Sequence, residues 1–184
     1  KMKSFYKNLL LSFAAMLLVN KTFCQVTLIT TGSSWKYLAN GSNQGTAWTG
    51  TAFSDAAWTS GNAQLGYGDG DEATVVSYGP SSTSKYITTY FRKSISVTNA
   101  SLYSNYTLRV RRDDGVVVYI NGVERYRSNM PTGTVSYTTL ASTAASDDGA
   151  TWQTATLPAA SLVTGTNVVA VEIHQNAGSS SDIS

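Results

Sequence analysis

Short runs of β-branched and aromatic residues, separated by glycine, asparagine, aspartate and serine, recur from residue 25 to the end of this 184-residue chain. No stretch of this region keeps an apolar period of 3.6 residues between helix caps, so the pattern favours strands over helices. Strands are predicted at 86–97, 106–112, 116–120, 123–127, 151–157 and 167–175. With the less regular runs before them, about eight strands indicate an all-β fold, an antiparallel jelly-roll β-sandwich.

Several of these runs also predict a hairpin turn, the buried face of a strand or the position of a strand in its sheet. Asn121 and Gly122 separate two β runs, and both residue types accept the positive φ of a two-residue hairpin turn. Apolar and polar residues alternate over 106–110, so one face of that strand is expected to be buried. The run 167–175 is almost continuously apolar, which is typical of a strand in the middle of its sheet. The segment 138–151 is expected to be a long surface loop.

The first 24 residues have the pattern of an export signal. Lys1, Lys3 and Lys7 precede an apolar run at 9–19, and smaller residues follow up to Cys24. The run is shorter than the roughly 20 apolar residues of a transmembrane helix. A signal peptide at 1–24 is therefore predicted, with an uncleaved anchor or a lipoprotein linkage at Cys24 as alternatives. The expected location is secreted or on the surface of a bacterial cell, with no stable membrane insertion after cleavage.

The charge balance changes when this segment is removed. The full chain has 13 basic and 11 acidic residues, and four of the lysines but no acidic residue lie in 1–24. The remaining chain has nine basic and 11 acidic residues, a net charge of −2. A nucleic-acid-binding protein needs a basic face, so no nucleic-acid partner is expected. The single cysteine also lies in this segment, which excludes a disulfide scaffold and a multi-cysteine metal site.

The rest of the chain is predicted to be one domain at 33–184, preceded by an N-terminal linker at 25–32. The sequence ends in Asp-Ile-Ser after a serine run, which looks like the beginning of a strand. We therefore expect a C-terminally truncated domain that lacks its final strand, with more protein after it.

A series of short motifs resembles a known family. These motifs are FSDAAW at 53–58, LGYGDG at 65–70, YFRK at 90–93, DDG at 113–115, YINGVE at 119–124 and GTNVVAVEIHQ at 165–175. In this order they resemble the galactose-binding-like jelly-roll modules of secreted bacterial hydrolases, and they are similar to the sugar-binding domain of β-galactosidase-type glycosidases. The resemblance covers about residues 33–184, and it implies an accessory module beside a catalytic domain.

Aromatic rings pack against the C–H faces of sugars, and polar side chains bind the hydroxyl groups. The candidate ligand-binding residues are Trp48, Tyr67, Tyr90, Arg92, Asp114, Glu124, Arg125 and His174. The alternative for the aromatic residues is the core, which is the expected place of Trp35 and Trp58. Asp114 alternatively fixes a turn, and His174, the only histidine, alternatively forms structural hydrogen bonds at a strand end.

The glycine-rich stretch 68–72 has hard oxygen ligands of the type that calcium binds. Asp69, Asp71 and Glu72 are the candidate ligands, and structural calcium is the candidate cofactor. The alternative is an acidic turn that caps its own backbone amides.

The sequence offers no catalytic set. His174 has no cysteine partners with which to form a zinc site. The chain also contains no Gly-x-Ser-x-Gly motif that would supply a nucleophilic serine. Asp113 and Asp114 are adjacent, so in extended backbone they face opposite ways, unlike the paired carboxylates of a glycosidase. We expect a non-catalytic extracellular module that binds carbohydrate and targets or positions an adjoining hydrolase domain. The alternative is a purely structural domain that packs on a downstream phosphoesterase or glycosidase domain.

Overall fold

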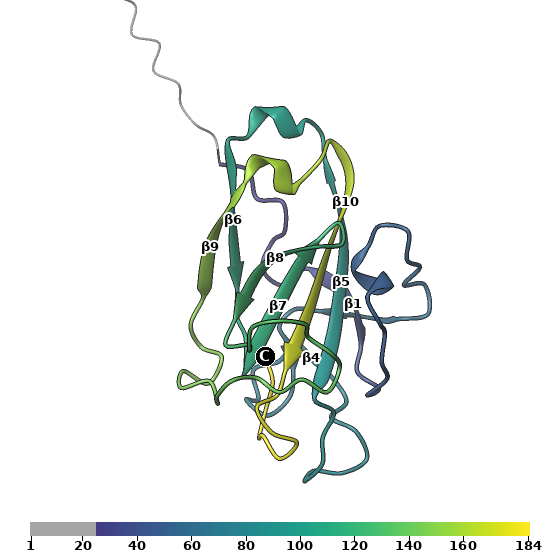
Figure 1. Ribbon diagram of the computed structural model, residues 1–184, viewed down its shortest axis with the longest axis vertical. Helices are drawn as coiled ribbons and strands as arrows, with labels where there is room; N and C mark the ends of the chain where they lie inside the picture. Colours follow the sequence, from purple (N-terminus) through teal and green to yellow (C-terminus); the bar gives the residue numbers. More distant parts are fainter. Residues whose placement is uncertain (1–24) are drawn as a thin grey trace, which may run out of the picture.

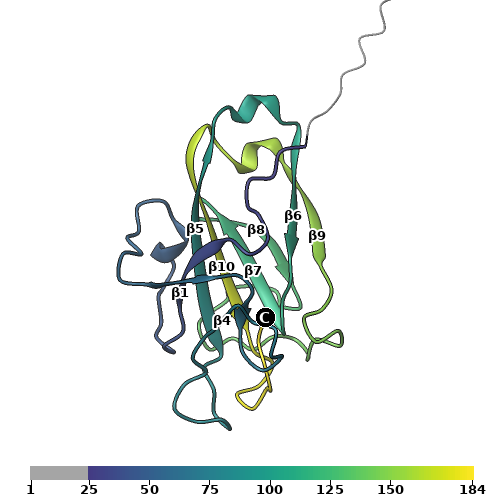
Figure 2. The ribbon, with the colours of Figure 1, turned by 180° about the vertical axis from the view of Figure 1, so that it is seen from behind.

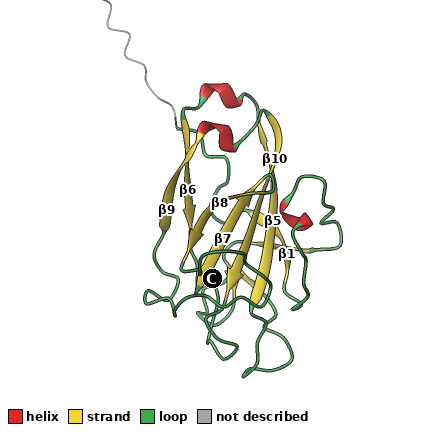
Figure 3. Cartoon of the chain, in the orientation of Figure 1, coloured by secondary structure: helices red, strands yellow, loops and turns green. Residues whose placement is uncertain are grey.

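The computed structural model describes residues 25–184, which contain ten strands and three short 3₁₀ helices joined by turns and loops (Figure 1, Figure 2 and Figure 3). The strands are β1 Ser34–Leu38, β2 Thr59–Asn62, β3 Leu65–Gly66, β4 Thr74–Val75, β5 Thr88–Val97, β6 Asn105–Val110, β7 Gly115–Ile120, β8 Val123–Ser128, β9 Gln153–Pro158 and β10 Gly165–His174. The 3₁₀ helices are η1 Ala47–Thr49, η2 Ala100–Leu102 and η3 Ala159–Ser161. None of the helices in residues 25–184 has the length and apolar character needed to cross a membrane. The predicted signal peptide at 1–24 lies outside the described residues.

The six predicted strands are confirmed, and their ends shift by at most two residues. The four strands before β5 have five residues or fewer, and the sequence pattern does not single them out. No strand lies between Ser128 and Gln153, which confirms the expected long loop at 138–151.

The largest sheet has six strands in the order β2-β1-β5-β10-β7-β8, and every neighbouring pair is antiparallel. β10 pairs with β5 from Gly165 to His174 and with β7 from Val169 to His174. The predicted central position of this strand is therefore confirmed. Its backbone groups bond on both edges, and its apolar side chains are buried on both faces.

The two faces of β10 enter different parts of the core. Val169, Val171 and Ile173 belong to a cluster that also contains Leu108 of β6. Val168 and Ala170, on the other face, pack against the aromatic side chains of Trp48 and Trp58 from the segment before β2. This burial on both sides explains why the strand has almost no polar alternation.

β6 and β9 form a separate antiparallel pair that lies beside the six-stranded sheet (Figure 1 and Figure 2). Tyr106, Leu108 and Val110 are partly buried, whereas the residues between them are exposed, as the alternation predicts. Leu157 of β9 is buried with Val97 of β5, so the two layers share a core. The predicted antiparallel β-sandwich is confirmed, while its finer jelly-roll topology stays a prediction.

The hairpin between β7 and β8 is also confirmed. Asn121 and Gly122 have φ values of 52° and 85°, the positive region that a two-residue hairpin turn requires. The Asn121 side chain fixes the turn to the neighbouring strand, because its Oδ1 accepts a hydrogen bond from the backbone N–H of Val168 at 2.8 Å.

The segment 25–32, expected as a linker, contains no strand but contacts the domain. Leu28 packs against the cluster that holds Leu157, and Ile29 packs against the cluster that holds Val169. These contacts hold the beginning of the described chain against the sandwich.

Candidate functional site

Two of the proposed sugar-stacking residues lie in an aromatic cluster on one face of the six-stranded sheet. Trp48 and Tyr90 are 2% and 3% exposed, and their ring centroids lie 4.8 Å apart in an edge-to-face contact. Trp58, expected in the core, is buried against Trp48 with centroids 6.2 Å apart, and Trp35 is partly buried against the other cluster. The faces of the Trp48 and Tyr90 rings are thus covered by side chains of the same chain.

Arg92 lies beside this aromatic cluster and is 2% exposed. Its Nε donates to Asp55 Oδ2 at 3.0 Å, and its Nη atoms donate to the carbonyl oxygens of Trp48, Gly50 and Phe53. The guanidinium group therefore holds the segment before β2 against β5.

Tyr67 and His174 are also buried, at 6% and 0% exposure. The Tyr67 hydroxyl accepts a hydrogen bond from Gln175 Nε2, and burial raises the pKa of the tyrosine. His174 Nδ1 lies 2.8 Å from the Thr139 carbonyl oxygen and 3.0 Å from Thr88 Oγ1. These contacts fit the structural role that was the alternative for His174.

Asp114 connects two loops from a buried position. Its Oδ1 accepts from the backbone N–H of Ala145 at 2.8 Å, and its Oδ2 accepts from that of Asn176 at 2.7 Å. Glu124 is exposed on β8 and pairs with Arg127 at 2.8 Å, and Arg125 is partly buried beside it. The eight candidate ligand-binding residues therefore do not meet in one pocket.

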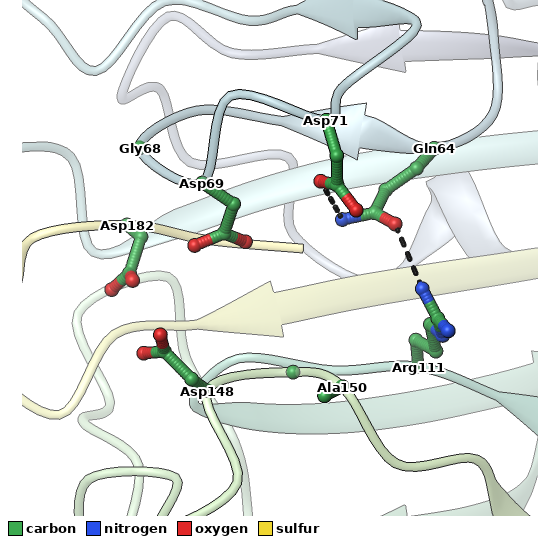
Figure 4. A pocket seen from close by; sticks show the side chains of 9 residues that line it. Gln64, Gly68, Asp69, Asp71, Arg111, Asp148, Ala150 and Asp182 are labelled. Carbon is green, nitrogen blue, oxygen red and sulfur yellow. Dashed lines mark hydrogen bonds between the residues drawn. The ribbon is translucent and has the colours of Figure 1, made fainter.

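A different set of residues surrounds a cavity of about 530 Å³, which we call the acidic pocket (Figure 4). Its lining residues are Gln64, Gly68, Asp69, Asp71, Arg111, Asp148, Gly149, Ala150 and Asp182. They come from the residues on both sides of β3, the residue after β6, the loop before β9 and the last residues of the chain. None of the eight candidate ligand-binding residues lines it, whereas Asp69 and Asp71 of the predicted calcium loop do.

Backbone hydrogen bonds bring these distant segments together. Tyr67 and Ile183 exchange a pair of them, at 3.1 Å and 3.0 Å, and the Asp113 N–H donates to the Ser184 carbonyl oxygen at 3.2 Å. Gly68 allows the approach: it has a φ of +112°, and a Cβ there would lie 2.5 Å from Asp182 Cβ. A glycine at position 68 of the motif at 65–70 is therefore required for close contact with the end of the chain.

Three carboxylates converge in the acidic pocket. Oxygen atoms of Asp69, Asp148 and Asp182 all lie within 4.8 Å of one another. Figure 4 shows the three side chains pointing toward a common space, on three separate segments of the ribbon. Asp69 and Asp148 are exposed at the mouth, and Asp182 is buried.

The crowding of these acids raises their pKa values. Burial and then the charge of Asp182 raise the pKa of Asp69 to about 6, and the charge of Asp182 raises the pKa of Asp148. Burial and the neighbouring carboxyls of Asp114 and Asp182 raise the pKa of Asp113 to about 8. All three pKa values are raised because burial and neighbouring carboxylates disfavour the ionised form of each aspartate.

The predicted calcium loop uses its acids in two ways. Glu72 accepts hydrogen bonds from the backbone N–H groups of Asp69 and Gly70 at 2.9 Å and 3.0 Å, as in the alternative of a self-capping turn. Asp71 accepts from Gln64 Nε2 at 3.3 Å. Only Asp69 joins a carboxylate cluster, and its partners Asp148 and Asp182 were not among the predicted ligands. No local spacing marks these two residues, because they lie in segments far from Asp69 in the sequence; the pairing of Tyr67 with Ile183 brings Asp182 to it.

The opposite wall of the acidic pocket is basic and amide-bearing. Arg111 Nη1 donates to Gln64 Oε1 at 3.3 Å, which extends the contact between Gln64 and Asp71 (Figure 4). The Arg111 guanidinium also lies 5.3 Å from the ring centroid of Trp152, and that of Arg109 lies 4.7 Å from it. On this side the cavity is therefore lined by a positively charged donor, an amide and a negatively charged acceptor, from Arg111, Gln64 and Asp71.

No protein-family model and no curated protein matches the sequence. Solved structures match through the fold. A β-glucuronidase from Bacteroides uniformis superposes with a TM-score of 0.51 and 18% identity, over 83% of this chain and 15% of that one. A β-glycosidase from Bacteroides vulgatus gives 0.50 and 15%, over 81% of this chain and 17% of that one.

The chain folds like one small domain of a glycosidase. It spans 15% to 17% of the length of the two proteins, and at this identity the similarity concerns the fold alone. The resemblance to glycosidase-associated domains is confirmed at this level, while the galactose-binding-like module stays a prediction.

Proposed function

We propose that the chain is a non-catalytic accessory domain of a larger extracellular glycoside hydrolase, in which it binds carbohydrate and positions the catalytic domain. The observation that carries the proposal is the fold match to glycosidases through only 15% to 17% of their chains. A match to so small a share of a glycosidase chain supports an accessory role, and what the domain binds has to be argued from its own site.

We place carbohydrate recognition on the Arg111 side of the acidic pocket. Gln64, Asp71 and Arg111 form a continuous line of hydrogen-bonding groups there, and two of the three are charged. Charged donors and acceptors form the stronger hydrogen bonds to hydroxyl groups, and a concave polar wall lets several act on one ligand. Because the aromatic candidates Trp48 and Tyr90 are buried, polar contacts rather than ring stacking carry this interaction.

Saccharide binding by the purified chain tests the proposal, on a glycan array and by affinity electrophoresis in bacterial and plant polysaccharides. Arg111→Ala should weaken binding at least tenfold, because loss of a charge-assisted hydrogen bond costs about 1.5–3 kcal/mol. Arg109→Ala is the matched control, since Arg109 shares the contact with Trp152 but does not line the pocket. The carbohydrate-binding half of the proposal fails if the wild-type chain binds no saccharide with or without calcium.

A second candidate is a purely structural domain that packs on the catalytic domain and has no ligand. Burial of Trp48, Tyr67 and Tyr90 favours it, because these rings serve the core instead of an open platform. Leu102 and Val75 are 76% and 69% exposed and are available for a partner surface. This candidate predicts stable association with the catalytic domain when the two are mixed as separate polypeptides, and no retention by any saccharide.

A further inference from the structure

The three converging carboxylates of the acidic pocket have the geometry of an ion site. We propose that Asp69, Asp148 and Asp182 bind one divalent cation, with calcium as the best-fitting ion. Calcium binds oxygen at about 2.4 Å, so two ligands on opposite sides of it lie about 4.8 Å apart. The oxygen atoms of the three aspartates lie within that distance of one another, so side-chain adjustments alone would bring all three to one ion.

An independent observation beside the three aspartates also indicates a cation. Asp113 is 2% exposed, its carboxyl lies against those of Asp114 and Asp182, and its Oδ2 is buried without a hydrogen-bond partner. Two ionised carboxylates side by side cannot donate to each other, so a buried pair needs a proton or a cation between them. A cation at Asp182 satisfies this requirement and leaves both groups ionised.

The surroundings do not neutralise the acids in another way. Among residues 25–184, no ion pair involves Asp69, Asp113, Asp148 or Asp182. Arg111, which shares the pocket, donates to Gln64 instead. Four carboxylates at this point are therefore left without a positive partner from the described part of the chain.

The backbone around the cluster is already fixed in the required shape. Asp148 has a positive φ of 49°, and Gly149 follows it with 64°, in a turn closed by the hydrogen bond from Ala150 N–H to the Asp147 carbonyl at 2.9 Å. The bridge between Tyr67 and Ile183 sets the distance between the other two ligand segments. A bound ion would thus connect the loop after β3, the loop before β9 and the last residues of the chain.

The predicted ligands Asp71 and Glu72 are not part of this site. Both Glu72 oxygens accept backbone N–H groups of their own loop, and Asp71 accepts from Gln64. Asp71 therefore gives a matched control, because it lines the same pocket with the same charge but belongs to another set of contacts.

Calorimetric titration of the EDTA-treated, purified chain with calcium chloride, and separately with magnesium chloride, tests the proposal. We expect one calcium per chain and a rise of several degrees in the thermal midpoint. Asp148→Asn should weaken calcium binding at least tenfold, whereas Asp71→Asn should change it less than about twofold. Asp148 is the residue of choice because its side chain is exposed, so the variant is expected to fold.

Terbium luminescence excited through the chain's aromatic residues, and its displacement by calcium, gives a second readout if a variant is unstable. The proposal is wrong if the wild-type chain binds neither calcium nor magnesium at millimolar concentration, since a shared proton then accounts for the acids. It is also wrong if Asp148→Asn binds calcium like the wild type, or if Asp71→Asn weakens binding as much. None of these measurements depends on saccharide binding. A negative result for the ion site is therefore distinguishable from a negative result for the proposed function.

Discussion

At the scale of single residues, Arg92 shows how a buried charge organises a loop. The Arg92 side chain is buried from solvent. Its guanidinium group donates hydrogen bonds to one carboxylate and three carbonyl oxygens of the segment 48–55. Removal of one partner of a buried charge leaves the others desolvated and unpaired, which is costlier than the loss of a single hydrogen bond.

Arg92→Ala should therefore lower the free energy of unfolding by about 3–5 kcal/mol, a large share of a typical domain's stability. Urea denaturation followed by tryptophan fluorescence measures the change, because Trp48 and Trp58 lie in the same region. Lys93→Ala is the control: the next residue on β5 makes an exposed hydrogen bond to the Ser34 carbonyl, and its loss should cost about 1 kcal/mol or less. Equal effects of the two substitutions would contradict this role of Arg92.

At the scale of elements, the turn of the β7–β8 hairpin depends on backbone conformation alone. A Cβ at Gly122 would meet no atom closer than 3.7 Å, so space does not restrict this position. The φ of +85° at Gly122 restricts the position instead, because residues with a Cβ rarely adopt positive φ values.

Gly122→Ala should destabilise the domain by about 1–2 kcal/mol through this conformational cost. Gly50→Ala provides the comparison, since Gly50 has a φ of −91° and a Cβ there would lie 3.5 Å from its nearest atom, an ordinary contact. Thermal unfolding by circular dichroism distinguishes the two variants. A Gly122→Ala midpoint equal to that of Gly50→Ala would show that the turn tolerates another conformation.

At the scale of the whole molecule, β10 is the strand around which the sandwich is built. It is bonded on both edges, and its two faces belong to different core clusters. β2 lies at the edge of the same sheet and pairs with β1 alone. Local opening of an edge strand breaks few contacts, whereas opening of β10 requires both layers to separate.

Native-state hydrogen exchange should therefore give the slowest amides in β10, with opening free energies close to the global value. The paired amides of β2 should exchange by local opening, at least tenfold faster than those of β10. Equally slow exchange in both strands would indicate that the sheet opens as one unit.

Much of the fold is encoded in local sequence patterns. The alternation in 106–110 and the Asn121-Gly122 pair act on neighbouring residues only, so the strand, its buried face and the hairpin could be predicted. The apolar run of β10 reports burial on both faces, and this placed the strand in the middle of the sheet. The short strands before β5 could not be predicted, because two to five residues carry too little periodicity.

The candidate site follows a different rule. The sequence by itself determined which residues could supply oxygen ligands to a metal ion or contact a sugar, and it identified Asp69 and the glycines around it. Only the tertiary structure decided that Asp69 meets Asp148 and Asp182, and that Trp48, Tyr90 and Arg92 are used within the core. The physical reason is that these contacts depend on backbone pairing between distant segments, as between Tyr67 and Ile183, which no local pattern records.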